Sequence, residues 1–249
     1  MTIKAIYFYT DERGRPVLRK VRAEPGKHFS IQVARYVHDR IYWKSNYGAL
    51  AKYQPDWTGR AMYNLPVLLD ALTHHESVWF VEGERDSDTL SSLKKVATTT
   101  NYQGASAFTE EQAAWFGWGR SKSIINIVQD NDLAGSWALW HRYSTLVGGG
   151  VDKSRIRLWR PTGGAKDITD VFLCGSRRKP VKRVGVRRAK EAASVEGAAE
   201  AAKQYLKKPG CGENPETGYV WGHEFAVSPT EVAQLKDWNP HPNKKREAS

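Results

Sequence analysis

The sequence predicts an α/β protein whose main domain is built on a parallel β-sheet, and three observations lead to this prediction. Two apolar runs of strand length, at 78–81 and 124–128, each end abruptly in carboxylates. Both runs lack the polar alternation of a half-exposed strand, as do strands buried on both faces of a parallel sheet. Segments of helical spacing lie between the apolar runs, and this βαβ alternation implies parallel strands with right-handed crossovers.

Residues 1–75 are expected to form a small mixed α+β subdomain. Ile3–Tyr9 and Val17–Arg22 have the composition of strands and flank a turn in which Gly14 is available for a positive φ angle. A β-hairpin is therefore expected to open the chain. The Tyr- and Trp-rich residues 31–72 have no topology that the pattern resolves, and they end in a short helix after Pro66.

The parallel-sheet domain is expected to cover residues 76–173. Its predicted strands lie at 78–81, 96–100, 124–128 and 155–159, and its helices lie near 86–95, 109–115 and 135–146. T-E-E-Q at 109–112 has the spacing of a capping box. In the first of these helices, Leu90 and Leu93 are expected to face the sheet.

Residues 174–249 are expected to form a basic, partly disordered tail with a possible helix at 189–206. Residues 174–208 alone carry eleven Lys and Arg against three acidic residues, a net +8 of the chain's +11. A flexible linker that is kept solvated by its charge and an arm that contacts phosphates both explain this composition.

Composition narrows the class of protein. A net charge of +11 and a pI near 9.6 make a polyanion the first partner to consider. The two cysteines, Cys174 and Cys211, form no C-x-x-C pair, which excludes a zinc ribbon and gives no disulfide framework. The N-terminus lacks the pattern of a signal peptide and no apolar run reaches transmembrane length. A cytoplasmic protein without a membrane partner is therefore expected.

The carboxylates that follow the two apolar runs are the strongest candidates for a functional site. The carboxyl ends of parallel strands share one edge of the sheet, so Glu82, Asp130 and Asp132 are expected to converge there. Ionised carboxylates repel one another without a cation, and an all-oxygen set favours Mg²⁺ or Mn²⁺ over zinc. Gly83 is expected to allow a close backbone approach to this site. These three acids are the predicted catalytic residues and metal ligands.

The two acidic segments together resemble the TOPRIM domain shared by DNA primases, topoisomerases and some nucleases. The first has the form E-G-x-x-D at Glu82, Gly83 and Asp86, and the second has D-x-D-x-A-G at 130–135. The sequence V-E-G-E-R-D-S-D and the basic hairpin upstream of it are most similar to the corresponding segments of phage and mobile-element primases. This resemblance implies a Rossmann-like TOPRIM domain and a metal-dependent nucleotidyl transfer.

Further acids match the family pattern less strongly. Asp86 is a candidate metal ligand, with helix-dipole complementation as the alternative, whereas Asp88 is expected at the surface. Asp167 and Asp170 are similar to a later acidic element of primase TOPRIM domains and are candidate ligands of an additional metal ion. A helix cap is the alternative for this pair.

The second strand of the hairpin carries the candidate nucleic-acid and nucleotide contacts, which are Arg19, Lys20, Arg22 and, just beyond the strand, Lys27. Phosphate binding and a solvated strand face are both consistent with this pattern.

The resemblance implies a primase core that makes short RNA primers from nucleoside triphosphates on a single-stranded DNA template. Primases of this family usually carry an N-terminal zinc-binding module, which this sequence lacks, so a separate zinc-binding subunit and a replicative helicase are expected as partners. Two alternatives stay open. One is a TOPRIM nuclease or ribosomal-RNA maturase with the same metals, and the other is a non-catalytic nucleic-acid-binding accessory protein.

Overall fold

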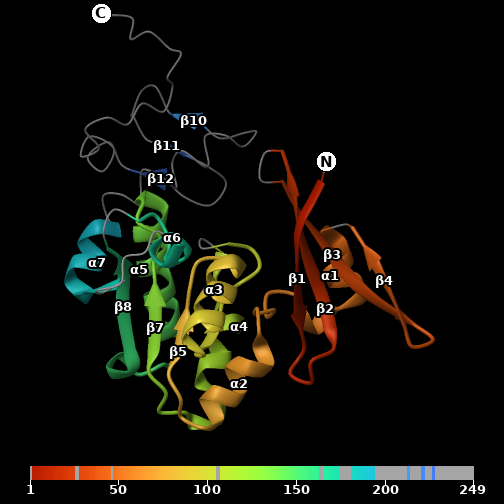
Figure 1. The fold of residues 1–249 in the computed structure, drawn as a ribbon, viewed down its shortest axis with the longest axis horizontal. Coiled ribbons are helices and arrows are strands. Elements are labelled where there is room, and N and C mark those ends of the chain that lie inside the picture. Colours follow the sequence, from red (N-terminus) through yellow and green to blue (C-terminus); the bar gives the residue numbers. More distant parts are fainter. Residues whose placement is uncertain are drawn as a thin grey trace, which may run out of the picture.

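The computed structural model describes residues 2–25, 28–45, 47–104, 107–162, 165–173, 181–193, 212–213, 220–221 and 226–227. Two sheets dominate these residues and lie side by side (Figure 1). Among the described residues, no helix is long and apolar enough to cross a membrane.

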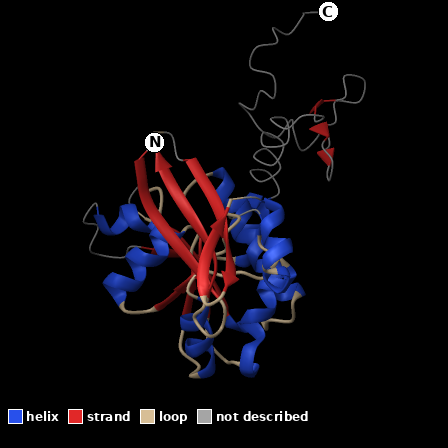
Figure 2. Ribbon diagram, turned by 90° about the vertical axis from the view of Figure 1, so that its right-hand side faces the viewer, coloured by secondary structure: helices blue, strands red, loops and turns tan. Residues whose placement is uncertain are grey.

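The N-terminal sheet is an antiparallel meander of β1 (Thr2–Thr10), β2 (Pro16–Glu24), β3 (His28–Val37) and β4 (Arg40–Lys44). The predicted hairpin is confirmed, and Gly14 in its turn has φ +80°. Figure 2, viewed from this side of the molecule, shows the long strands in front of the helices. The Tyr- and Trp-rich stretch, whose topology the sequence pattern did not predict, contributes to β3 and forms β4, α1 (Tyr47–Tyr53) and the short 3-10 helix η1 (Pro55–Trp57).

A five-stranded sheet forms the second half, in the order β6-β5-β7-β8-β9. Its parallel strands are β5 (Val78–Phe80), β6 (Ala97–Thr99), β7 (Ile125–Val128) and β8 (Ile156–Pro161). The parallel sheet predicted from the apolar runs is therefore confirmed. The last strand, β9 (Val181–Val184), is antiparallel to β8 and completes the sheet.

Helices cover both faces of this sheet. One face packs against α2 (Leu65–Thr73), α4 (Glu110–Ala113), the 3-10 helix η3 (Ala114–Arg120), α5 (Leu133–Gly148) and α7 (Val186–Ala192). The other face packs against α3 (Glu84–Lys94) and α6 (Ile168–Leu173). The remaining described elements are η4 (Lys153–Arg155) and the short strands β10 (Gly212–Glu213), β11 (Val220–Trp221) and β12 (Ala226–Val227).

The capping box at the start of α4 is confirmed, since Thr109 and Gln112 satisfy each other's backbone N–H groups. Two expectations are wrong. Leu93 does not face the sheet, because the buried stripe of α3 runs through Asp86, Ser87 and Leu90 and leaves Leu93 57% exposed. Within the predicted tail, residues 181–184 form β9 and residues 186–192 form α7, so this described part is not a plain linker. Most of the predicted helix at 189–206 lies outside the described residues.

The two halves pack against each other through aromatic residues. Tyr9 of β1 forms a bridge with Tyr63, and the carbonyl of Tyr63 accepts a hydrogen bond from the hydroxyl of Thr99, the last residue of β6. Tyr9 and Tyr63 both belong to the core of the N-terminal half, with ring centroids 5.4 Å apart. Tyr9 of β1 and Lys20 of β2 both contact Glu84, which follows β5, so this packing places β1 and β2 beside the carboxyl ends of β5 and β6.

Candidate active site

The strand order of the parallel sheet reverses between β5 and β7. The chain runs from β5 outward to β6, then crosses back to place β7 on the other side of β5. Open α/β sheets bind ligands in the crevice at such a reversal, beyond the carboxyl ends of the strands. Glu82 follows β5 and Asp130 follows β7, so both carboxylates lie at this position.

A backbone contact joins these two strand ends. The N–H of Asp130 donates a hydrogen bond to Oε2 of Glu82 over 3.4 Å. Glu82 and Asp130 therefore lie next to each other, as predicted.

Asp132 lies at the start of α5 and caps it, since its Oδ1 accepts a hydrogen bond from the N–H of Gly135 over 2.8 Å. Its Oδ2 lies 3.6 Å from Nζ of Lys166, in the loop after β8. Asn131 fastens the same loop, because its N–H donates to the carbonyl of Lys166 over 2.6 Å. Asp132 therefore combines a capping role with a place at the edge of the acidic site.

Gly135 is the glycine that permits a close backbone approach here. A Cβ at this position would lie 2.2 Å from the carbonyl oxygen of Asp130 and 2.9 Å from its nitrogen. A Cβ at Gly83 would meet only the Asp86 carboxylate, at 3.8 Å, which is an ordinary contact. Gly135 is therefore required for packing within the protein, whereas the approach expected at Gly83 is toward a bound ligand and stays a prediction.

The acids of this site influence one another strongly. Burial raises the pKa of Asp130 to about 8, and the charges of Glu82, Asp86, Asp132 and Asp167 act in the same direction. Burial also raises the pKa of Glu82, against the lowering effect of Arg142 and with the raising effect of Asp132. Burial and the neighbouring acids therefore disfavour ionisation of Glu82 and Asp130 in the metal-free protein.

Arg142 of α5 is a fully buried cation behind this acidic crevice. Its Nη1 donates to the carbonyl of Val81 over 3.0 Å and its Nη2 donates to Oδ1 of Asn101 over 2.9 Å. The guanidinium also lies 4.1 Å from the ring centroid of Phe80. Burial lowers the pKa of Arg142 to about 10, while Glu82 and Asp130 oppose that shift. Arg142 remains charged at neutral pH and offsets part of the acidic charge.

Asp86 of α3 contacts α6 through hydrogen bonds with Thr169. Oδ1 of Asp86 accepts from the N–H of Thr169 over 3.1 Å and from its hydroxyl over 2.5 Å. Burial raises the pKa of Asp86 to about 6, against the lowering effect of these bonds. Asp167 caps α6, since its Oδ1 accepts from the N–H of Asp170 over 2.7 Å. Oδ1 of Asp170 lies 3.9 Å from Nη2 of Arg85.

A cavity of about 300 Å³ opens between the acidic strand ends and the N-terminal sheet. Glu82, Asp86, Asp130 and Asp167 line it from one side. From the other side it is lined by Tyr7, Lys20, Arg22 and Phe29. The cavity thus has an acidic wall from the parallel sheet and a basic, aromatic wall from β1 to β3.

The predicted basic residues differ in how far they are available to a ligand. Nζ of Lys20 lies 2.8 Å from the buried carboxylate of Glu84, which also accepts the hydroxyl of Tyr9 over 2.5 Å. Arg19 donates to Gln32 over 2.6 Å and lies over the Trp43 ring. The cation of Lys20 is therefore partly neutralised within the protein.

Among the predicted basic residues, Arg22 lines this cavity and has a donor nitrogen that no described residue accepts from. Its Nε is buried without a hydrogen-bond partner among the described residues, and its Nη2 lies 3.9 Å from Oε1 of Glu24, which is long for an ion pair. Lys27 lies outside the described residues. Asp88, expected at the surface, is exposed and accepts the hydroxyl of Tyr63 over 2.9 Å.

The donor set fits a hard divalent cation. The carboxylates of this wall offer only oxygen donors. The pKa of Asp130 is raised by burial first and by the neighbouring negative charges second, and a cation would neutralise those charges. In the side-chain conformations of the described residues, no three Asp, Glu, His or Cys groups converge as the ligands of one ion. Glu82 and Asp130 line this cavity and Asp132 does not, so the metal set of these three acids stays a prediction.

Sequence reasoning missed three partners of the site, namely Arg142, Asn101 and Lys166. Arg142 had a readable signal, because Ala138, Leu139, Tyr143 and Leu146 form an apolar stripe on α5 on which it is the single charged position. A charged residue on such a stripe is buried and needs partners. Asn101 and Lys166 carried no signal of this kind.

No protein-family model matches the sequence, and no curated protein matches it. Solved structures do match. The DNA primase domain from Pseudomonas aeruginosa superposes with a TM-score of 0.51 at 15% identity, over 81% of this chain and 60% of that one. The primase fragment of the bacteriophage T7 primase-helicase protein matches with a TM-score of 0.46 at 20% identity, over 70% of this chain and 59% of that one.

The E. coli primase catalytic core matches with a TM-score of 0.47 at 16% identity, and this chain covers 58% of it. The chain thus spans 58–60% of the length of these three structures. The fold and the site define this chain as an α/β protein with an acidic site at the carboxyl ends of its parallel strands. The match to the Pseudomonas aeruginosa domain gives the fold more narrowly: this chain has the fold of a DNA primase catalytic core.

Proposed function

We propose that this chain is a primase catalytic core that joins ribonucleotides on a single-stranded DNA template. The observation that carries the proposal is the cavity at the reversal point of the parallel sheet, whose acidic wall faces a basic wall. Phosphoryl transfer depends on positioning and charge stabilisation, and this cavity offers both kinds of charge within one space.

In this proposal Glu82, Asp130 and Asp132 hold one or two Mg²⁺ or Mn²⁺ ions, and Asp86, Asp167 and Asp170 extend the same acidic wall. A bound divalent ion would activate a 3′-hydroxyl and neutralise triphosphate charge. Arg142 keeps the end of β5, and with it Glu82, in place.

The N-terminal sheet would supply the phosphate contacts. Arg22 lines the cavity and keeps an unpaired donor, so it is the first candidate for a phosphate of template or nucleotide. Lys20 would act through its pairing with Glu84, by holding the sheet against α3. Arg19 lies over Trp43 on the same sheet and would extend the contact along a strand of template.

A primer-synthesis assay tests the proposal. Single-stranded DNA, four ribonucleoside triphosphates with one labelled, and Mg²⁺ should give short labelled products with the parent protein. Asp130→Asn should lower the yield about 100-fold or more, because loss of a charged metal ligand removes several kcal/mol of stabilisation. Asp70→Asn is the matched control, since Asp70 is exposed on α2 and absent from the cavity lining.

The same assay separates the alternatives. Degradation of the single-stranded DNA without incorporation of the labelled nucleotide would identify a TOPRIM nuclease, and tight DNA binding with neither reaction would identify an accessory protein. Either result would overturn the primase proposal.

A further inference from the structure

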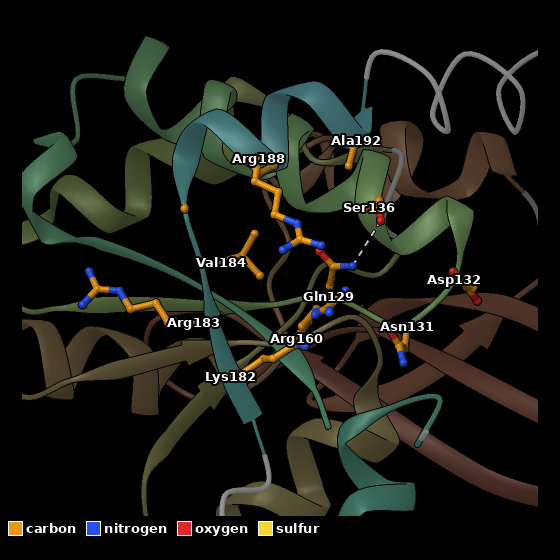
Figure 3. Close-up of a pocket in the computed structure, with 12 residues that line it drawn as sticks. Gln129, Asn131, Asp132, Ser136, Arg160, Lys182, Arg183, Val184, Arg188 and Ala192 are labelled. Carbon is orange, nitrogen blue, oxygen red and sulfur yellow. Dashed lines mark hydrogen bonds between the residues drawn. The ribbon is translucent and has the colours of Figure 1, made fainter. Parts of the chain in front are cut away.

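A second cavity, of about 540 Å³, lies beyond the Asn131–Asp132 turn and is separate from the acidic cavity. Residues from β8, β9, α5 and α7 line it (Figure 3). Its size is within the range of small-molecule binding sites. Asp132, one of the proposed metal ligands, belongs to its lining, whereas Glu82 and Asp130 do not.

Two cations face each other across the strands of this cavity. Arg160 of β8 and Lys182 of β9 are directly opposite in the antiparallel register. Their side chains lie on the same face of the sheet as Leu158 and Val184, which pack toward α5 and α7. Like charges directly opposite on neighbouring strands destabilise a sheet, so this pair calls for a counter-charge.

Arg188 of α7 adds a third cation, and its guanidinium reaches down toward Gln129 (Figure 3). Within the described part of the chain, no carboxylate lies within ion-pair distance of Arg160, Lys182 or Arg188. The nearby acid of the lining, Asp132, is paired with Lys166. The counter-charge is therefore not supplied by these residues.

A fixed polar group and an apolar wall complete the cavity. Gln129 is buried, and its Nε2 donates to Oγ of Ser136 over 3.1 Å, as the dashed line in Figure 3 marks. Val184, Ala189 and Ala192 form the apolar part of the lining. Three cations beside an apolar surface match a ligand with a polyanionic end and a flat apolar end.

We propose that this cavity binds a nucleoside triphosphate, with its phosphates at Arg160, Lys182 and Arg188 and its base against Val184 and Ala192. A single nucleotide fits better than a nucleic-acid strand, because the cations gather inside one concavity next to an apolar wall instead of following a track. The site does not depend on the proposed primer synthesis, since none of these residues lines the acidic cavity.

Calorimetric titration with ATP in EDTA tests the proposal without any contribution from the metal site. The parent should bind one ATP, and Lys182→Ala and Arg188→Ala should each weaken binding about tenfold, as expected for loss of a charge-assisted hydrogen bond. Arg183→Ala is the matched control. It removes the same charge from the next residue of β9. Arg183 belongs to the cavity lining, but its side chain points away from those of Lys182 and Arg188 (Figure 3), so binding should change less than twofold.

Further ligands establish the class. Adenosine should not bind measurably, and inorganic tripolyphosphate should compete with ATP but bind more weakly, because it lacks the base. Asp130→Asn should bind ATP as the parent does, which separates this site from the catalytic proposal. Equal effects of Arg183→Ala and Lys182→Ala, or a single-stranded oligonucleotide that binds more tightly than ATP and loses as much affinity in Lys182→Ala, would overturn the proposal.

Discussion

Arg142 donates a hydrogen bond of 3.0 Å to the carbonyl of Val81, the residue that directly precedes Glu82. The same guanidinium donates to Asn101, beyond the end of β6. One buried cation thus fixes two neighbouring strand ends and partly neutralises the acidic crevice between them. The geometry of the site depends on a residue about 60 positions away in the sequence.

Arg142→Met should lower the free energy of unfolding by about 3–5 kcal/mol, because it removes a buried charge with two hydrogen-bonded partners and leaves Glu82 without its counter-charge. Urea denaturation of the metal-free protein measures this. Arg157→Met is the control, since Arg157 donates to the neighbouring carbonyls of Ser154 and Ile156 and should cost less than about 1 kcal/mol. A similar loss in both variants would contradict the role given to Arg142.

Gly135→Ala should displace the Asp130 turn, because the added Cβ would overlap the Asp130 backbone. We expect a loss of about 1–3 kcal/mol in stability, typical of overpacking, together with loss of Mg²⁺-induced thermal stabilisation. Gly148→Ala, on the same helix, is the control. A Cβ at Gly148 would meet nothing within 4 Å, so the variant should equal or exceed the parent in stability and keep its response to Mg²⁺. Equal melting curves for the two variants would refute the close-approach argument.

The parallel sheet and the position of Glu82 and Asp130 could be predicted from the sequence, because buried strands leave a continuous apolar run and acids directly after such runs must share a sheet edge. β9 could not be predicted in this way. Its sequence V-K-R-V has only two apolar residues, and the strand forms because Val184 packs on the core beneath α7 and Val181 packs on the opposite face.

Side-chain roles were harder to predict than strand ends. Lys20 has the pattern of a phosphate contact, yet it pairs with Glu84, because the N-terminal sheet packs on α3 in a way that no local pattern shows. Asp167 has the pattern of a metal ligand and also caps α6. Tertiary contacts decide between such roles, and composition and spacing alone do not.

Glu84→Ala should destabilise the protein by about 3 kcal/mol, because it leaves the poorly exposed Lys20 and the buried Tyr9 hydroxyl without their shared partner. Thermal and urea denaturation measure the loss, and Lys20→Met in the Glu84→Ala background should recover part of it. Glu110→Ala, an exposed acid in the first turn of α4, should cost only a few tenths of a kcal/mol. An unchanged stability in Glu84→Ala would show that the two halves do not depend on this contact.

His141 should make stability depend on pH. Its Nε2 lies 3.0 Å from the carbonyl of Phe108 and its ring stacks on Trp137. Burial lowers the pKa of His141 below its usual 6.5, with a smaller contribution from the Arg142 charge. The unfolded chain therefore binds the proton more readily than the folded one, so the contribution of His141 to stability is complete above pH 6.5 and falls as the pH drops from 6.5 through the folded-state pKa.

His141→Gln should remove that part of the pH dependence. Unfolding free energies measured between pH 7.5 and 5 should fall less steeply for this variant than for the parent. His28→Gln is the control at an exposed histidine and should follow the parent curve. A parent and a His141→Gln variant with parallel curves would contradict the assignment.

The central claim is that the acidic cavity joins nucleotides under the direction of a template, and homopolymer templates test it most directly. With Mg²⁺ and a short RNA primer, the parent should incorporate ATP on oligo(dT) and GTP on oligo(dC), with little incorporation of the mismatched nucleotide. Asp130→Asn should do neither, although it should still bind ATP. Incorporation that ignores the template, or equal incorporation by the parent and Asp130→Asn, would contradict the claim.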